Sequence, residues 1–247
     1  MDSPDYHDYY TWQSDVPDFG RAAQEKLRNS TALISRVGGL GGPLALSLAA
    51  AGVGRIILAH AGPLRPDDLN RQILITHAGL GEPRHTQAAK TLQRFNPNLE
   101  IESIGENISE QNVAALVART DIVFSCAPLF EERLLMNREA VAQGKFFVDG
   151  AMHCLEGHVL AVRPGQSTCL ACLVEAPPEY WKRRFPVIGA VSALVAQIAA
   201  LEGIKLLTDF APAATDQLIH IDTRTLRLRK LPVRRHPSCP HCATLNR

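Results

Sequence analysis

The chain has 247 residues, of which 46% are hydrophobic and 21% charged, the balance of a globular protein with a sizeable core. Its formal net charge of +1 gives no electrostatic reason to expect a nucleic acid or a membrane as partner. The polar, acidic start MDSPDYHDYY does not resemble a secretory signal, so we expect a cytoplasmic protein whose six cysteines are thiols or metal ligands.

The first part of the chain alternates between strand-like and helix-like segments. A glycine cluster, GGLGG at 38–42, separates a short apolar run from an Ala/Leu-rich segment that ends at Gly52 and Gly54. With the apolar run that follows, this makes one βαβ unit. Repeated βα alternation predicts an α/β fold with a Rossmann-like, doubly wound, mostly parallel sheet. In chain order, the predicted helices are 18–29, 44–51, 87–95, 109–118 with Ser109 as N-cap, and 131–143, and the predicted strands are 31–35, 55–59, 100–103, 121–125 and 146–148.

Further along the chain, the pattern changes to strand-like segments, two cysteine pairs, one long helix and a β-rich tail. The apolar stretch 188–207 is interrupted by Gln197, Glu202 and Lys205, which favours a core helix over a membrane span. Residues 224–235 alternate apolar and basic side chains, which is typical of an edge strand with a solvated face; a basic binding patch is the alternative. Without a repeat or a linker, we expect one domain over 1–247.

Two C-x-x-C pairs, Cys169/Cys172 and Cys239/Cys242, predict a metal site. Four thiolates complete a tetrahedral shell that prefers zinc, and such a closed site is structural because no position is left for water. It would tie the C-terminal tail to the middle of the chain. His241 as a substitute ligand and a redox-active pair are the alternatives. Buried structural thiols are expected for the two remaining cysteines, Cys126 and Cys154.

The run GGLGGPLALSLAAAGVGRIIL, followed by DLNRQIL, resembles the family of MoeB, ThiF and HesA, the bacterial relatives of ubiquitin-activating enzymes. The resemblance extends to DFGRAAQEKL, GEPRHTQAAKTLQRFNPNLEI and GAVSALVAQIAALEGIKLL, and so covers nearly the whole chain. It implies a homodimer that binds MgATP and attaches AMP to the C-terminal glycine of a small ubiquitin-like sulfur carrier. By the family pattern, the nucleotide-binding residues are Gly38, Gly39, Gly41, Arg71, Gln72 and Arg84; a dimer contact is the alternative for Arg71 and Gln72.

Six positions depart from the family pattern, and in that pattern all six belong to the nucleotide site. A loop glycine that lets backbone approach the phosphates, the acid that binds the ribose and the magnesium-binding aspartate are replaced. So are a lysine, the Asn of the NLxRQ element and an arginine near the start of the chain. The loop glycine is replaced by Arg36, the ribose-binding acid by His60 and the magnesium-binding aspartate by Pro128. The lysine is replaced by Arg84, the Asn by Asp68 and the arginine by Trp12.

Several readings of these residues remain open. Arg36 and Arg84 are expected near one another, either as a new anion site or as groups that are solvated or paired with Asp68. Trp12 is expected to pack at a subunit contact, with stacking on a ligand ring as the alternative. His60 is interpreted as a strand-end histidine.

The substitutions predict a non-adenylating or strongly modified member that binds a protein partner, either a small ubiquitin-like carrier or an active paralogue. We expect ATP and magnesium binding to be lost or altered, and no catalytic residue is assigned. The first alternative is a working adenylyltransferase in which Asp68, Glu131 or Glu132 supplies a relocated carboxylate. The second is a dinucleotide-dependent oxidoreductase. The sequence argues against it, because it lacks the G-x-G-x-x-G spacing and the acidic residue at the end of the second strand.

Overall fold

The computed structural model describes residues 5–174, 176–179 and 186–243. Their centre is one eight-stranded sheet with the strand order β3-β2-β1-β4-β5-β6-β7-β8. The strands β3, β2, β1, β4 and β5 run parallel, and β6, β7 and β8 continue the same sheet antiparallel. The predicted Rossmann-like sheet and its β-rich C-terminal part are therefore confirmed. The strands are β1 (Thr31–Ser35), β2 (Arg55–Ala59), β3 (Glu100–Ile104), β4 (Ile122–Ser125), β5 (Phe146–His153), β6 (Glu156–Val162), β7 (Gln217–Asp222) and β8 (Arg227–Pro232).

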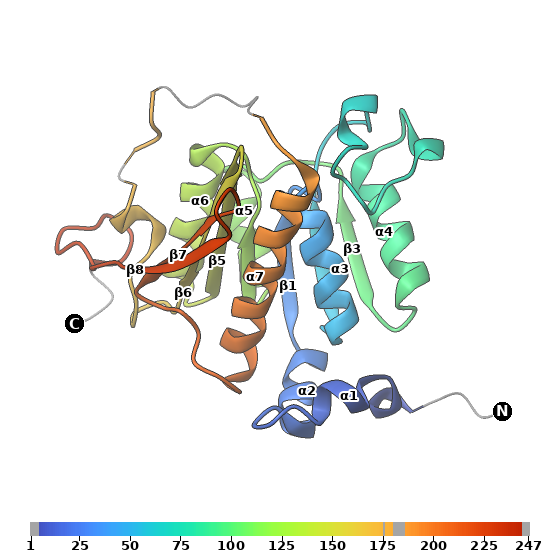
Figure 1. Cartoon of the computed structure of the whole chain (residues 1–247), viewed down its shortest axis with the longest axis horizontal. Helices are drawn as coiled ribbons and strands as arrows, with labels where there is room; N and C mark the ends of the chain where they lie inside the picture. Colours follow the sequence, from blue (N-terminus) through green and yellow to red (C-terminus); the bar gives the residue numbers. More distant parts are fainter. Residues whose placement is uncertain (1–4, 175, 180–185, 244–247) are drawn as a thin grey trace.

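Helices cover both faces of the sheet (Figure 1). One apolar cluster joins the sheet to α2, α3, α4 and α7, and a second cluster joins its other face to α5, α6 and the cysteine pairs. The helices are α1 (Thr11–Ser14), α2 (Gly20–Arg28), α3 (Gly41–Ala51), α4 (Arg84–Phe95), α5 (Val113–Ala118), α6 (Phe130–Ala142) and α7 (Gly189–Thr208), with short 3-10 turns η1 (Tyr6–Tyr10), η2 (Pro66–Asp68), η3 (His77–Gly79) and η4 (Leu170–Cys172).

The helix α7 is the core helix expected from residues 188–207. By length and composition it is the one described helix that could cross a membrane, but half of its most apolar window is buried inside the protein. It packs on β5, β6 and α3. At Gly203 the approach is so close that an added Cβ would lie 2.2 Å from the ring of Phe124. These contacts give the helix a role in the core.

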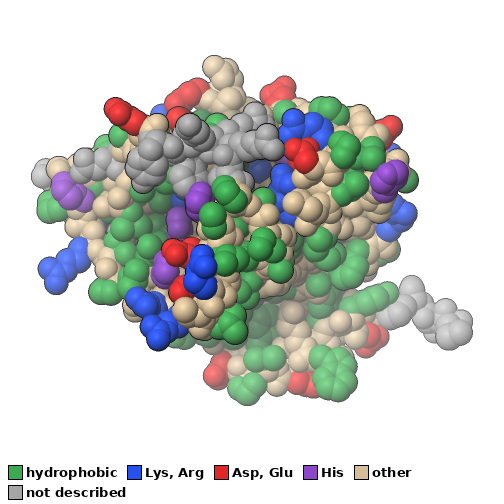
Figure 2. Space-filling model, turned by 45° about the horizontal axis from the view of Figure 1, so that its top comes forward, with side chains coloured by type: hydrophobic (Ala, Val, Ile, Leu, Met, Phe, Trp, Pro, Cys, Tyr) green, Lys and Arg blue, Asp and Glu red, His purple; other side chains and the backbone are tan. Residues whose placement is uncertain are grey.

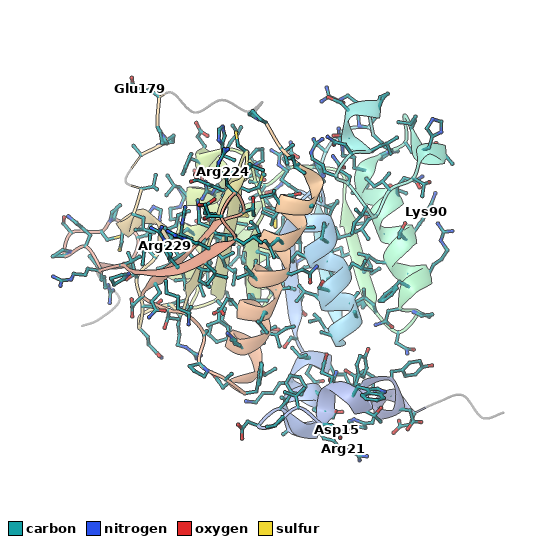
Figure 3. The ribbon with its side chains drawn as sticks, in the orientation of Figure 1. Asp15, Arg21, Lys90, Glu179, Arg224 and Arg229 are labelled. Atoms are coloured by element: carbon teal, nitrogen blue, oxygen red, sulfur yellow. The ribbon has the colours of Figure 1, made fainter. Side chains whose placement is uncertain are left out.

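The strand β8 is the edge strand expected within 224–235. All six of its residues are exposed, and it pairs with β7 on one side at the end of the sheet. Figure 3 labels Arg224 and Arg229 on this hairpin, across the molecule from Lys90 on α4. The basic side chains therefore lie on a solvated edge.

The two largest differences from the predicted boundaries are at the start of α5 and the end of β5, whereas α3 and α4 each begin three residues earlier than predicted. The helix α5 begins at Val113, because the side chain of Asn112 accepts the N–H of Ser109 at 2.9 Å and closes a separate turn there. The strand β5 continues beyond residue 148 to His153, because Ala151 to His153 pair with β6. Both differences come from hydrogen bonds that local apolar periodicity does not reveal.

Candidate functional site

A cavity of about 680 Å³ lies at the carboxyl ends of the parallel strands. This is where open α/β sheets bind ligands, because the loops that follow neighbouring strands converge there. Its wall comes from the loops after β1, β2 and β4, from the start of α4 and from residues 150–152 of β5. Figure 2 shows Lys and Arg side chains beside Asp and Glu side chains on the face that comes forward from the top of the molecule.

The glycine cluster forms the cavity wall between β1 and α3. Arg36 has φ +61°, a left-handed conformation that glycine adopts more readily than arginine. A Cβ on Gly39 would lie 2.8 Å from Cγ of Arg71, so the arginine lies directly on the loop. Gly41 opens α3, where a Cβ would lie 2.5 Å from the carbonyl oxygen of Arg36. These glycines permit a tight turn and the close approach of Arg71.

Asp68 joins the residues that the sequence placed in the nucleotide site. Its carboxylate accepts hydrogen bonds from Gln72 Nε2 at 2.7 Å, from Arg71 at 3.2 Å and from Arg84 at 2.5 and 3.2 Å. It also accepts the backbone N–H of Arg65 at 3.0 Å. Burial by itself would raise the pKa of Asp68, but the hydrogen bonds of Arg84 and Arg65 and the nearby guanidinium charges outweigh it and lower that pKa. Asp68 is therefore ionised at neutral pH.

Arg36 is held in a second ion pair. Its Nε lies 3.1 and 2.9 Å from the two carboxylate oxygens of Glu132, and its terminal nitrogen lies 2.5 Å from one of them. The two side chains are 11% and 6% exposed. Arg36 and Arg84 line the same cavity, as expected, and the pairing of Arg84 with Asp68 is the one anticipated. Arg36, however, pairs with Glu132 and not with Asp68.

A third ion pair joins Arg133 of α6 to Asp149 of β5. The distances are 2.9 and 2.5 Å, and Arg133 also lies 3.0 Å from Nε2 of His158. Arg133 and Asp149 are 1% and 0% exposed, and Arg133 lines the cavity. Sequence reasoning missed these residues. The signal was present in FFVDG, because a carboxylate inside an apolar strand requires a cationic partner.

The carboxylates proposed as relocated metal ligands differ in their surroundings. Asp68 and Glu132 are both ion-paired with arginines, and Glu131 is exposed. Pro128, His60, Gly38 and Gln72 line the cavity. Trp12 is 92% exposed within the monomer, so it is not buried by its own chain.

The four cysteines of the two C-x-x-C pairs come together as predicted. Their four sulfur atoms all lie within 4.8 Å of one another, with Cys169 3.6 Å from Cys239 and Cys172 3.5 Å from Cys242. A tetrahedral zinc ion with Zn–S bonds of about 2.3 Å requires sulfur–sulfur separations of about 3.8 Å. The cluster therefore fits a metal ion, and its thiolate chemistry suits zinc.

The buried side chain of Asn137 supports the cysteine cluster. It accepts the N–H of Leu170 at 2.9 Å and lies 2.7 Å from Nδ1 of His241, so it joins both cysteine segments to α6. Among the described residues, the potential metal ligands that cluster here are the four cysteine sulfurs, and His241 is not one of them. Cys126 and Cys154, expected to be buried, are both partly exposed, and Cys126 lines the cavity.

Comparisons with known proteins agree with this architecture. The model of the ThiF family matches residues 10–241. Protein HesA of Leptolyngbya boryana is 43% identical over 233 residues, covering 94% of this chain and 84% of that protein. A sulfur carrier protein adenylyltransferase of Thermus thermophilus is 31% identical over 244 residues, covering 95% and 90%. Among solved structures, E. coli MccB with MccA-N7isoASN superposes with a TM-score of 0.86 at 19% identity, covering 98% of this chain and 76% of that one.

Proposed function

This chain belongs to the ThiF family, and from that premise we propose that it is a modified member that binds a protein partner without transferring AMP to it. The observation that carries this proposal is the pairing of the cavity's cations. Within the described part of the chain, every arginine that lines the cavity faces a carboxylate of the same chain. The pairs are Arg36–Glu132, Arg65–Asp67, Arg71–Asp68, Arg84–Asp68 and Arg133–Asp149.

Nucleotide activation requires the opposite arrangement. Adenylyl transfer from ATP depends on cations that meet phosphate oxygens and on a carboxylate that holds magnesium. Here five arginines are set against four carboxylates, so one positive charge remains for the whole cavity. Asp68 and Glu132 are engaged by arginines, and Pro128 offers no acceptor side chain. The residues present therefore do not fit MgATP.

The proposed partner is the C-terminal tail of a small ubiquitin-like carrier, with an active paralogue as the other option. Relatives named as sulfur carrier protein adenylyltransferases support the carrier. A net charge of one also suits a single terminal carboxylate better than a triphosphate. In this proposal, Gly38, Gly39, Gly41, Arg71, Gln72 and Arg84 form the wall of the tail site and do not bind nucleotide.

The proposed working unit is a homodimer of single-domain chains in the cytoplasm. Its support is that all eight strands form one sheet and that Tyr9, Trp12 and Val16 are exposed to 58%, 92% and 45% near the start of the chain. Such a cluster of exposed large apolar side chains marks an interaction surface. The four cysteines would hold a structural zinc ion that fixes the C-terminal tail.

A working adenylyltransferase is the second candidate, favoured by the names of the relatives at 30% and 31% identity. Two measurements separate the candidates: calorimetric titration with MgATP, and ATP–pyrophosphate exchange with candidate carriers, both with an active adenylyltransferase as positive control. No heat and no exchange, together with binding of a carrier that depends on its last residues, is the expected result. Exchange above background would establish the second candidate.

A further inference from the structure

The carboxylate of Asp68 occupies a position that is built like an anion site. The side chains of Arg71, Gln72 and Arg84 direct N–H donors at it. The two arginines among them carry a positive charge. The side chain of Asp68 is only 3% exposed, so these donors surround it almost completely. Charge-assisted bonds of this kind, including the contact of Arg84 at 2.5 Å, are the strong class of hydrogen bond in proteins.

The donors around Asp68 also border the cavity. Arg71 contacts the backbone at Gly39, and Gln72 lies beside Gly38. Arg84 lies close to Gly62, where an added Cβ would be 3.1 Å from its Nη1. All three line the cavity together with Asp68. A phosphate group that requires both guanidinium groups would therefore compete for the same N–H groups that Asp68 already binds.

We propose that Asp68 determines the charge of the ligand that this cavity accepts, because its carboxylate fills the anion position formed by Arg71, Gln72 and Arg84 and so excludes phosphate-bearing ligands. A carboxylate fixed in the chain competes at a high effective concentration with any free anion. The inference rests on the proposed function, since it names the residue that leaves a single net positive charge on a wall that carries two arginines.

Replacing the carboxylate of Asp68 by a carboxamide tests the effect of its charge on anion binding while its shape is kept. Asp68→Asn keeps the shape and one acceptor oxygen, which can still take a hydrogen bond from Gln72 or from the backbone N–H of Arg65. It removes one negative charge and frees the guanidinium groups of Arg84 and Arg71. The matched control is Asp67→Asn, which removes the same charge from the cavity wall at an exposed residue whose partner, Arg65, lies 3.5 Å away.

The test is calorimetric titration of the full-length, zinc-loaded protein with inorganic pyrophosphate at low ionic strength. We expect no detectable binding of pyrophosphate to the unmodified chain or to Asp67→Asn. Asp68→Asn should bind it at least about tenfold more tightly than the weakest affinity that the titration detects, and this binding should weaken with added salt. Three results would overturn the inference: binding to the unmodified chain as tight as to Asp68→Asn, no gain in folded Asp68→Asn, or an equal gain in Asp67→Asn.

A second variant covers the case in which Asp68→Asn does not fold, since an arginine that loses its buried partner is costly. Asp68→Asn combined with Arg84→Lys keeps the cation but places it on a flexible stem that can reach water. The same gain in pyrophosphate binding is expected, and a folded double variant without it would contradict the inference. ATP–pyrophosphate exchange by the unmodified chain would instead refute the proposed function, so the two failures are distinguishable.

Discussion

Arg133 and Asp149 form a bidentate ion pair that solvent does not reach, with distances of 2.9 and 2.5 Å between α6 and β5. Burial by itself would raise the pKa of Asp149, but the charge of Arg133 and the hydrogen bonds from His158 and Arg133 hold it well below its ordinary value. Arg133 borders the cavity, and its pair with Asp149 fixes α6 to the sheet at this point. It therefore links the stability of the fold to the shape of the site.

Replacement of Asp149 by Asn should lower the free energy of unfolding by about 3–5 kcal/mol, because it leaves the guanidinium of Arg133 buried without a counter-charge. Chemical denaturation followed by circular dichroism measures this change. Glu110→Gln is the control, since it breaks the exposed pair with Arg138 and should change stability far less. Equal effects of the two substitutions would show that burial of the Arg133 pair contributes little.

The same pair predicts how stability depends on pH. The pKa of Asp149 is lower in the folded chain than in the unfolded chain, where an aspartate titrates near 3.9. Its contribution is therefore fully present above about pH 5 and is lost as the pH falls toward the folded-state value. Asp68, whose pKa is also lowered, adds to this loss. Denaturation midpoints between pH 3 and pH 7 should fall less steeply in Asp149→Asn than in the unmodified chain; parallel curves would contradict the prediction.

Removal of the proposed zinc ion should release the C-terminal segment from α6. A cross-link that closes a loop as long as the one from Cys169 to Cys239 restricts the unfolded chain by on the order of 4 kcal/mol. Cys239→Ser, or a chelator, should therefore lower the melting temperature and abolish stoichiometric zinc, measured by elemental analysis. Cys154→Ser removes a thiol outside the cluster and should retain one zinc per chain. Zinc retained after Cys239→Ser would disprove the four-cysteine site.

The exposed Trp12 predicts the surface used for self-association. Trp12→Ser should shift sedimentation from dimer toward monomer, because it removes a large apolar side chain that is 92% exposed in the monomer. Leu228→Ser, on the distant strand β8, changes a side chain that is 56% exposed and should leave the dimer intact. A monomeric unmodified chain at micromolar concentration would rule out the proposed homodimer.

Close packing beneath α7 gives a final prediction. Gly203→Ala should destabilise the chain by about 1–3 kcal/mol, because the new methyl group would meet the ring of Phe124 at 2.2 Å. Thermal melts measure the effect, and Leu201→Ala at a half-exposed position of the same helix is the control. Unchanged stability of Gly203→Ala would show that α7 can shift away from β4 at little cost.

The sequence by itself determined the parts of this protein that depend on local order. The GGLGG cluster between two apolar runs predicted a βαβ unit, and β1, α3 and β2 form it. The two C-x-x-C pairs predicted a metal cluster, because each pair already places two ligands on one turn and thiolate chemistry does not depend on the rest of the chain. Apolar spacing likewise identified α7 and the edge strand β8.

Only the tertiary structure decided which charges meet. Glu132 is far from Arg36 in the chain. Asp149 lies on β5, which pairs with β4 in parallel and with β6 in antiparallel orientation. Neither ion pair can therefore be predicted from the spacing of its residues in the sequence. The pairing of Asp68 with Arg84 was anticipated, whereas its bonds to Arg71 and Gln72, three and four residues further along the chain, were not predicted from the sequence. The physical reason is that hydrogen bonds form between atoms within about 3 Å in space. Sequence patterns fix the direction of an element, whereas the packing of the sheet and its loops fixes which side chains reach one another.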